Sequence, residues 1–429
     1  MPSHRTCPSA WSCAALPIEP RSAPTWAQAL GASAVFEWAG NAWYGVGEAC
    51  ALEAADAPFA LVDQAEEILR SIDPADGVEA EPVWLGGFAF DPARTDRGPW
   101  AGFPAGRLVL PELLLHTSGD RAWAMAIGPA ESRDTLRPRL ERALEVAQRS
   151  TRSARCPSAA DVAPETPREA WDAGVEAALS AFATGALQKV VLARTIRAAL
   201  RGPADPLALL GRFRALHPDC FRFAFGAGAR CFLGATPELL FTRQGNTAST
   251  MALAGSVRRD ADPERDRALT AALLDDPKER HEHALVADAI RHALAPISTS
   301  LHAQGPEIRA LRNVAHLETA FQATLREGTS TRALLEALHP TPAVCGAPRA
   351  PARALLREIE SFDRGWYAGP VGVVGRRSAT FAVALRCMLL ERDSARLFVG
   401  AGLVPGSTAE REWAETCVKS QAMLRALEG

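Results

Sequence analysis

The chain closes with "ARLFVGAGLVPGSTAEREWAETCVKSQAMLRALE", residues 395–428. The first ten residues are mostly apolar and predict a strand, and the helix that follows has Ser407 or Thr408 as its cap. Two further apolar runs, "GPVGVVG" (369–375) and "TFAVALRCMLL" (380–390), predict strands just upstream. Several strands therefore precede one helix here, instead of alternating with helices one by one.

The same grouping continues upstream. We predict strands at 188–198, 220–226, 229–235, 238–243, 247–252, 308–314 and 318–326, and helices at 168–184, 262–275, 277–295, 329–338 and 348–359. Grouped strands and grouped helices predict the α+β class, because α/β folds require regular βαβ alternation.

The chain is expected to have two parts. Residues 1–150 contain short strand-like pieces and end in a charged helix, whereas the stretch 150–167 is rich in Ser, Ala and Pro and is typical of a linker. We therefore expect an N-terminal subregion at 1–150 and a main region at 165–429, both belonging to one fold.

Composition favours a cytoplasmic protein and leaves small or mildly anionic partners open. The 429 residues are 48% hydrophobic and 23% charged, with a net charge of −3. Basic residues are scattered, so neither nucleic acid nor a membrane surface is an expected partner. No apolar run reaches the roughly 20 residues that span a bilayer, and the N-terminus is a poor signal peptide. The nine cysteines include no CxxC pair and no Cys/His metal spacing.

The predicted final helix places three charged groups on one face. Glu412, Glu415 and Lys419 stand at i, i+3 and i+7. The simple alternative to a site is a solvated face with a weak salt bridge. Trp413 and Cys417 in the same helix instead favour packing of much of its surface.

A further acidic group is Glu282, in "DDPKERHEHALVADAI" (275–290). His281 and His283 flank it, but neighbouring residues on a helix do not face each other and the HExxH pattern is absent, so no zinc site is predicted. Mg²⁺ prefers a couple of carboxylates together with water and substrate oxygens. Glu282 and Glu415 could supply these carboxylates from two helices.

Two other ionisable groups lie in apolar surroundings. Glu238, just after Pro237, would be partly desolvated and would keep its proton, as a general acid requires; the alternative is a strand-end glutamate in solvent. Arg386 is expected at an interior strand position in "FAVALRCML", where a guanidinium needs an anionic partner. That partner is either a substrate carboxylate or a structural Asp or Glu.

Lys189 opens the apolar run "KVVLARTIRAAL" (189–200). By itself such a lysine is usually a snorkelling side chain with its ammonium in water. Strand alternation places Lys189, Val191 and Ala193 on one face. The small neighbours on that face could leave room for a ring beside the amine.

Glycine-rich strings provide no nucleotide-binding signature. "GAGARC" (226–231) leads from strand to strand, and "GAGLVPG" (400–406) fits neither GxGxxG nor GxxxxGK[ST]. The amides of the second string could still bind a carboxylate. No GxSxG elbow and no cysteine-nucleophile signature is present.

Taken together, these segments resemble the chorismate-utilising enzymes, namely the anthranilate, aminodeoxychorismate, isochorismate and salicylate synthases. The resemblance covers residues 165–429 and rests on strings in matching order: "QKVVLAR", "GATPELLF", "LAGSVRR", "KERHEHALV", "VAHLETAF", "LHPTPAVCG", "RGWYAGPVG", "FAVALR", "VGAGLVPGS" and "EREWAETCVKSQAM". The N-terminal third matches only loosely, through "LGGFAFDP". The resemblance implies a fold of large β-sheets packed together, with helices on the outside, and a catalytic role for residues 165–429.

Three positions discriminate between reactions within this family. Members that use ammonia carry Gln where this chain has Lys189, whereas isochorismate and salicylate synthases carry Lys as the base that activates water. Aminodeoxychorismate enzymes have a nucleophilic Lys at the position of Ala254, and salicylate synthases usually have Thr at the position of Ala343. The resemblance therefore implies an isomerase that converts chorismate to isochorismate. A salicylate synthase and a non-catalytic chorismate-binding protein are the alternatives.

The family also implies roles for individual residues. Lys189 would deprotonate water for attack at C2 of chorismate, and Glu238 would protonate the departing C4 hydroxyl. Mg²⁺ is the implied cofactor, with Glu282, Glu412 and Glu415 as its ligands. The implied substrate-binding residues are Ser256, His316, Tyr367, Arg386, Gly400, Gly402 and Lys419.

Chorismate is thus the expected partner of the chain. The sequence contains no fused glutamine amidotransferase domain, and we expect a monomer or a homodimer. Menaquinone, catecholate siderophore and salicylate-derived siderophore pathways all begin with isochorismate formation, and the residues do not distinguish between these pathways.

Overall fold

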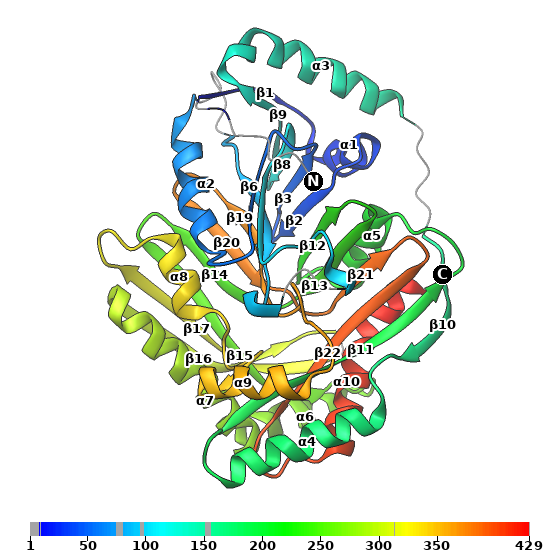
Figure 1. Cartoon of the computed structure of the whole chain (residues 1–429), viewed down its shortest axis with the longest axis vertical. Helices are drawn as coiled ribbons and strands as arrows, with labels where there is room; N and C mark the ends of the chain where they lie inside the picture. Colours follow the sequence, from blue (N-terminus) through cyan, green and yellow to red (C-terminus); the bar gives the residue numbers. More distant parts are fainter. Residues whose placement is uncertain are drawn as a thin grey trace.

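The computed structural model describes residues 8, 10–73, 80–94, 98–150, 156–312 and 314–428. Two large β-sheets form the body of the molecule, and helices lie on their outer sides (Figure 1). This architecture confirms the α+β class and the packed sheets that the sequence predicts. None of the described helices is both long enough and apolar enough to cross a membrane.

The larger sheet combines early and late parts of the chain. Its strands are β1 (Trp11–Pro17), β2 (Ala34–Trp38), β3 (Asn41–Val46), β5 (Ile72–Asp73), β8 (Leu113–Ser118), β9 (Arg121–Pro129), β10 (Ala159–Pro164), β11 (Lys189–Leu200), β12 (Phe221–Ala227), β13 (Arg230–Thr236), β18 (Gly346–Ala347), β21 (Cys387–Glu391) and β22 (Ser394–Leu403). They run in the order β10-β11-β22-β21-β13-β12-β2-β3-β8-β9-β1-β5, and β18 also pairs with β11. The sheet thus sets β11 directly beside β22, although about two hundred residues separate them.

The smaller sheet is antiparallel throughout the described pairs. Its strands are β4 (Cys50–Ala54), β6 (Trp84–Phe88), β7 (Gly106–Leu110), β14 (Leu239–Gln244), β15 (Thr247–Arg258), β16 (Ser298–Ala310), β17 (Val314–Leu325), β19 (Pro370–Val374) and β20 (Ser378–Val383). Their order is β16-β17-β15-β14-β20-β19-β6-β7-β4.

The α-helices follow the capping rules that the sequence displays. They are α1 (Ala23–Leu30), α2 (Ala60–Ser71), α3 (Arg133–Arg149), α4 (Arg168–Ala183), α5 (Pro206–Leu216), α6 (Pro263–Asp275), α7 (Pro277–Leu294), α8 (Thr331–Leu338), α9 (Arg349–Ile359) and α10 (Ala409–Leu424). Helices α5, α6 and α7 each begin with Pro after an Asp cap, and Asp276 Oδ1 accepts from Lys278 N at 2.9 Å. Thr408 caps α10 as the sequence predicts.

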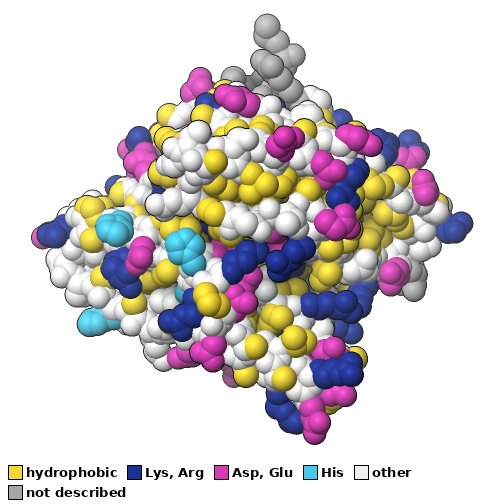
Figure 2. All heavy atoms as spheres, turned by 90° about the horizontal axis from the view of Figure 1, so that it is seen from below, with side chains coloured by type: hydrophobic (Ala, Val, Ile, Leu, Met, Phe, Trp, Pro, Cys, Tyr) yellow, Lys and Arg dark blue, Asp and Glu magenta, His cyan; other side chains and the backbone are white. Residues whose placement is uncertain are grey.

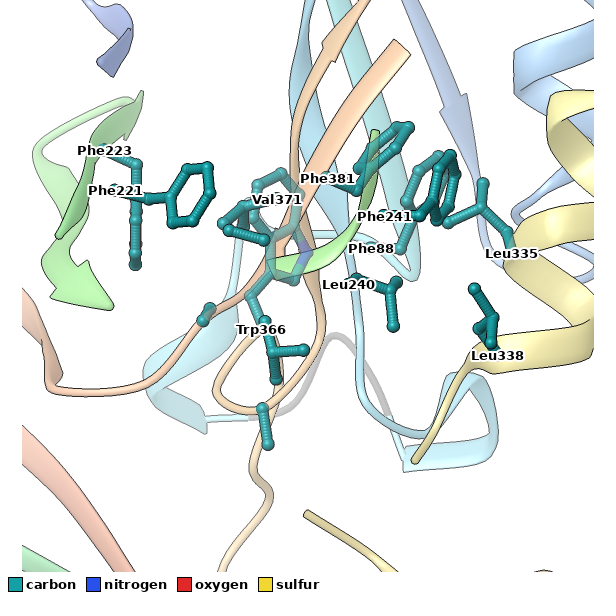
Figure 3. Close-up of a cluster of buried hydrophobic side chains, with 14 of the residues drawn as sticks. Phe88, Phe221, Phe223, Leu240, Phe241, Leu335, Leu338, Trp366, Val371 and Phe381 are labelled. Carbon is teal, nitrogen blue, oxygen red and sulfur yellow. The ribbon is translucent and has the colours of Figure 1, made fainter. Parts of the chain in front are cut away.

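The main hydrophobic core fills the space between the two sheets (Figure 3). Phe221 and Phe223 come from β12 of the larger sheet, while Phe241 and Phe381 come from β14 and β20 of the smaller one. A second core lies between the outer face of the larger sheet and helices α1, α3 and α5. Each fully buried Phe contributes about 1.5–3 kcal/mol, so these layers hold both sheets firmly.

Three structural expectations were wrong. The predicted linker contains β10, which pairs with β11; its residues 151–155 lie outside the described part. Strand β16 begins at Ser298, ten residues before the predicted start, and its exposed side chains lack an apolar pattern. The run at 380–390 is two strands, because the chain leaves the smaller sheet after β20 and enters the larger sheet at β21. Arg386 therefore lies in the connection between them, not inside a strand, and has a φ of 47°.

Candidate active site

One cavity gathers the predicted site residues. It has a volume of about 840 Å³ including its opening, which is the size of a small-ligand pocket. Every residue that lines it falls between Lys189 and Met423. It is lined by all the predicted site residues except Glu412, namely Lys189, Glu238, Ser256, Glu282, His316, Tyr367, Arg386, Gly400, Gly402, Glu415 and Lys419.

Lys189 stands at the start of β11 and is buried in the wall of this cavity. Its Nζ lies 2.9 Å from Oε1 of Glu282, which projects from α7. The side chain is only 1% exposed, so the alternative of a snorkelling lysine is wrong. Gly402 on β22 is needed beside this pair, because a Cβ there would lie 2.8 Å from Glu282 Oε1 and 3.3 Å from Lys189 Cε.

A second lysine enters the cavity from α10. Lys419 Nζ lies 2.6 Å from Glu415 Oε1 and donates to the Gly400 carbonyl oxygen at 3.1 Å. Burial alone would lower the pKa of Lys419, but Glu415 raises it above the ordinary value. Two of the three charged groups predicted on one face of the last helix, Glu415 and Lys419, therefore line the cavity, and the lysine stays cationic.

Glu412 lies behind the cavity wall and not on it. It is buried, and its Oε1 is 3.6 Å from Lys278 Nζ. Burial and the neighbouring Glu415 raise the pKa of Glu412. Each predicted metal ligand is thus paired with a lysine, and no group of three or more His, Cys, Asp or Glu in the described part of the chain is arranged to hold a metal.

Glu279 is a neighbouring carboxylate that the sequence reasoning missed. Its Oε2 accepts a hydrogen bond from Ser256 N at 2.8 Å. Burial raises the pKa of Glu279, and Glu282 and Glu415 act in the same direction. Its position three residues before Glu282, on the same helix face, is the signal that could have revealed it. Carboxylates from α7 and α10 therefore repel one another, which a hard divalent cation would relieve.

Glu238 faces the cavity from the connection between β13 and β14. It is 5% exposed and forms no ion pair among the described residues. Burial raises the pKa of Glu238 to about 7, although Lys189 and Lys419 act against this. A carboxyl group with this pKa holds a proton near neutrality and can donate it.

The remaining polar residues that line the cavity include Arg386, His316 and Tyr367. Arg386 is half-buried and its guanidinium contacts Cys220; burial lowers its pKa, and no carboxylate among the described residues acts against this. Burial and Arg386 lower the pKa of His316 to about 3, so this imidazole is neutral. Tyr367 stacks on Phe398 with ring centroids 5.3 Å apart. A guanidinium that lines a cavity without a carboxylate partner points to an anionic ligand.

The two histidines beside Glu282 lie in different surroundings. His283 is buried, with its two ring nitrogens 3.2 Å from the Ala254 carbonyl oxygen and 2.8 Å from Thr319 Oγ1. His281 is exposed on the outer side of α7.

Figure 2 shows basic and acidic side chains interspersed over one face of the molecule.

The chain is similar to known proteins of one family. The profile of the family described as "Chorismate binding enzyme" matches residues 34–428. A salicylate biosynthesis isochorismate synthase of Pseudomonas aeruginosa is 37% identical over 390 residues, which cover 88% of this chain and 81% of the relative. Isochorismate synthase MenF of Bacillus subtilis is 32% identical over 353 residues, covering 81% and 75% of the two chains.

The solved structures agree as well. The menaquinone-specific isochorismate synthase MenF of Escherichia coli superimposes with a TM-score of 0.83 at 27% identity, covering 99% of this chain and 96% of that one. The N-terminal third, which the sequence strings match only loosely, is included in this superposition. The chain belongs to the chorismate binding enzyme family.

Proposed function

We propose that this protein is a Mg²⁺-dependent isochorismate synthase. The proposal rests on one observation above all, namely that a buried amine, Lys189, and a buried carboxyl group, Glu238, whose pKa burial raises to about 7, line the same cavity. Water is a weak nucleophile and hydroxide is a poor leaving group, so a base and an acid address the two barriers of a hydroxyl exchange.

In the proposed reaction Lys189 is the base that takes a proton from water as the water oxygen attacks C2 of chorismate. The ring double bonds shift, the bond from C4 to its hydroxyl breaks, and Glu238 gives its proton to the departing oxygen. One water enters and one leaves, so substrate and product are isomers. Burial raises the pKa of Glu238 to about 7, which favours the protonated form that this step needs.

The substrate's enolpyruvyl carboxylate is assigned to the part of the cavity that Arg386 and Lys419 line. Arg386 and Lys419 supply positive charge there, and Tyr367 with the backbone around Gly400 and Gly402 supplies hydrogen-bonding groups. His316 and Ser256 line the wall beside the ring. The two positive side chains and the hydrogen-bond donors would hold the substrate so that its ring faces both Lys189 and Glu238.

The carboxylates of α7 and α10 fit a hard cation by their chemistry and their mutual repulsion. Glu282 and Glu415 would hold Mg²⁺ from the cavity wall, with Glu412 and Glu279 bound directly or through water. When bound, the ion supplies positive charge that neutralises the ring carboxylate of the substrate. Glu282 and Glu415 must then exchange their lysine partners for the ion.

A salicylate synthase is the second candidate, because the relative from Pseudomonas aeruginosa is named for salicylate biosynthesis. That relative is itself named an isochorismate synthase. Ala343 lines the cavity where salicylate synthases usually carry Thr, which favours release of isochorismate without pyruvate elimination.

The test is incubation of the purified protein with chorismate and Mg²⁺, followed by chromatography of the products. We expect isochorismate as the main product and no turnover after chelation by EDTA. Salicylate with equimolar pyruvate would establish the second candidate. Anthranilate formed only with ammonia would contradict both.

A further inference from the structure

The general acid Glu238 lacks a strong electrostatic partner. The charged or titratable side chains that face it are Lys189 from β11, Lys419 from α10 and Tyr367, and none forms an ion pair or hydrogen bond with it among the described residues. Once Glu238 gives up its proton, a carboxylate is left in a buried site. Such a charge needs a donor nearby.

Thr341 places a hydroxyl at this carboxyl group. Its side chain is buried, and its hydroxyl acts against the effect of burial by lowering the pKa of Glu238. The approach is looser than an ordinary hydrogen bond, because Oγ1 of Thr341 has no partner of normal geometry in the described part of the chain. This hydroxyl is therefore a donor that is still available.

The backbone around Thr341 is fixed with respect to the cavity. Its carbonyl oxygen accepts from Val344 N at 3.1 Å and from Cys345 N at 3.0 Å. The Cys345 carbonyl oxygen accepts from Val191 N at 2.9 Å, two residues after Lys189 on β11. The turn that carries Thr341 is thus attached to the strand of the proposed base, and its residues Ala343 and Val344 line the cavity.

We propose that Thr341 is a positioning residue for Glu238. Its hydroxyl donates a hydrogen bond to the carboxylate that forms as Glu238 protonates the departing C4 hydroxyl, and it holds that carboxyl group toward the ring. The inference rests on the proposed function, since it assigns Glu238 the role of general acid. Thr341 itself does not touch the reacting atoms.

The experiment compares Thr341→Val, which keeps the shape and removes the hydroxyl, with Thr341→Ser, which keeps the hydroxyl. A hydrogen bond to a charged group is lost in Thr341→Val, so we expect kcat to fall roughly tenfold to hundredfold while KM changes less than about twofold. The decline of kcat at high pH should move to higher pH, because the acid loses a donor that favours its charged form. Thr341→Ser should restore both kcat and the pH profile.

Thr250→Val is the matched control. Thr250 is also 5% exposed, and its hydroxyl donates to the Leu240 carbonyl oxygen at 2.6 Å, away from the cavity lining. The substitution Thr250→Val should lower thermal stability and leave the pH profile of kcat unchanged. If Thr341→Val does not fold, Thr341→Ala provides the same comparison.

A wild-type kcat and pH profile in Thr341→Val, or equal losses in Thr341→Val and Thr341→Ser, would overturn the positioning role. Glu238→Gln in the same series separates this failure from failure of the proposed function. Full turnover in Glu238→Gln would show that Glu238 is not the general acid, whatever the result for the Thr341 variants.

Discussion

Buried charges occupy two regions of this molecule and are arranged differently in each. On β2 of the larger sheet, Glu37 accepts hydrogen bonds from the Tyr44 hydroxyl at 2.8 Å, from Arg222 Nε at 2.9 Å and from Arg214. Burial alone would raise the pKa of Glu37, but the two guanidinium groups lower it. The protein itself satisfies this carboxylate on all sides.

The charges around the cavity are satisfied only in part. Lys189 and Glu282 form one ion pair, with Nζ and Oε1 2.9 Å apart. Arg386 has no carboxylate partner among the described residues. Glu238 is buried, and burial raises its pKa. A charge cluster that is complete in itself stabilises the fold, whereas charges left facing a cavity are available to a ligand. The two regions should therefore respond oppositely to substitution.

Lys189→Ala tests the cavity side of this comparison with the largest expected effect. Loss of a general base lowers turnover by about 10²–10⁴-fold. Substrate binding, measured by calorimetry, should remain detectable because the anion-binding residues are intact. Turnover equal to that of the wild type would contradict the mechanism.

The pH dependence of turnover tests the role of Glu238. Burial raises the pKa of this acid to about 7, so its reactive, protonated form is lost as pH rises through 7, and kcat should fall there. Glu238→Gln should lower kcat by about 10²–10⁴-fold and remove this dependence. A pH profile that stays flat from 6 to 9 in the wild type would speak against Glu238 as the acid.

Glu37→Gln tests the structural side. Removing one member of a buried, hydrogen-bonded charge cluster costs about 3–5 kcal/mol, because the remaining charges lose their partner. We expect the free energy of unfolding in urea to drop by this amount, while kcat per folded molecule stays at the wild-type value. A large loss of kcat without a loss of stability would remove the distinction between the two regions.

Lys278→Met has the smallest expected effect, a change in the affinity for Mg²⁺ at the proposed metal ligands. Lys278 is partly exposed and lies 3.6 Å from Glu412 Oε1, where it competes with a cation. Such a pair is worth about 1 kcal/mol or less, so Mg²⁺ should bind up to about fivefold more tightly by calorimetry. The gain should shrink at high salt. Weaker binding would show that Lys278 supports the carboxylates instead of competing with the ion.

Local patterns were sufficient to predict most of the main region. The Asp caps followed by Pro place the starts of α6 and α7 within a residue or two of the predicted starts, and strand alternation correctly puts Lys189 and Val191 toward the cavity. The apolar run at 380–390 misled the prediction, because all of it except Thr380, Leu385 and Arg386 is buried and no turn residue marks the passage from one sheet to the other. That passage creates the exceptional backbone at Arg386.

Non-local contacts explain what the sequence could not reveal at the site. Helix spacing alone could have identified Glu279, but the pairing of Lys189 with Glu282 joins residues 93 positions apart. The raised pKa of Glu238 depends on burial by elements that come from the whole of the main region. Thr341 stands in the family string "LHPTPAVCG", but that string assigns it no role, and the role proposed for it follows only from its position beside that acid.

The central claim is that one hydroxyl enters at C2 as another leaves from C4. Turnover of chorismate in water enriched with ¹⁸O, followed by mass spectrometry of the isochorismate formed, tests it directly. The account predicts one ¹⁸O in the ring hydroxyl of the product and none in unreacted chorismate at early times. Isochorismate without the label would contradict it, because the hydroxyl would then have moved within the molecule.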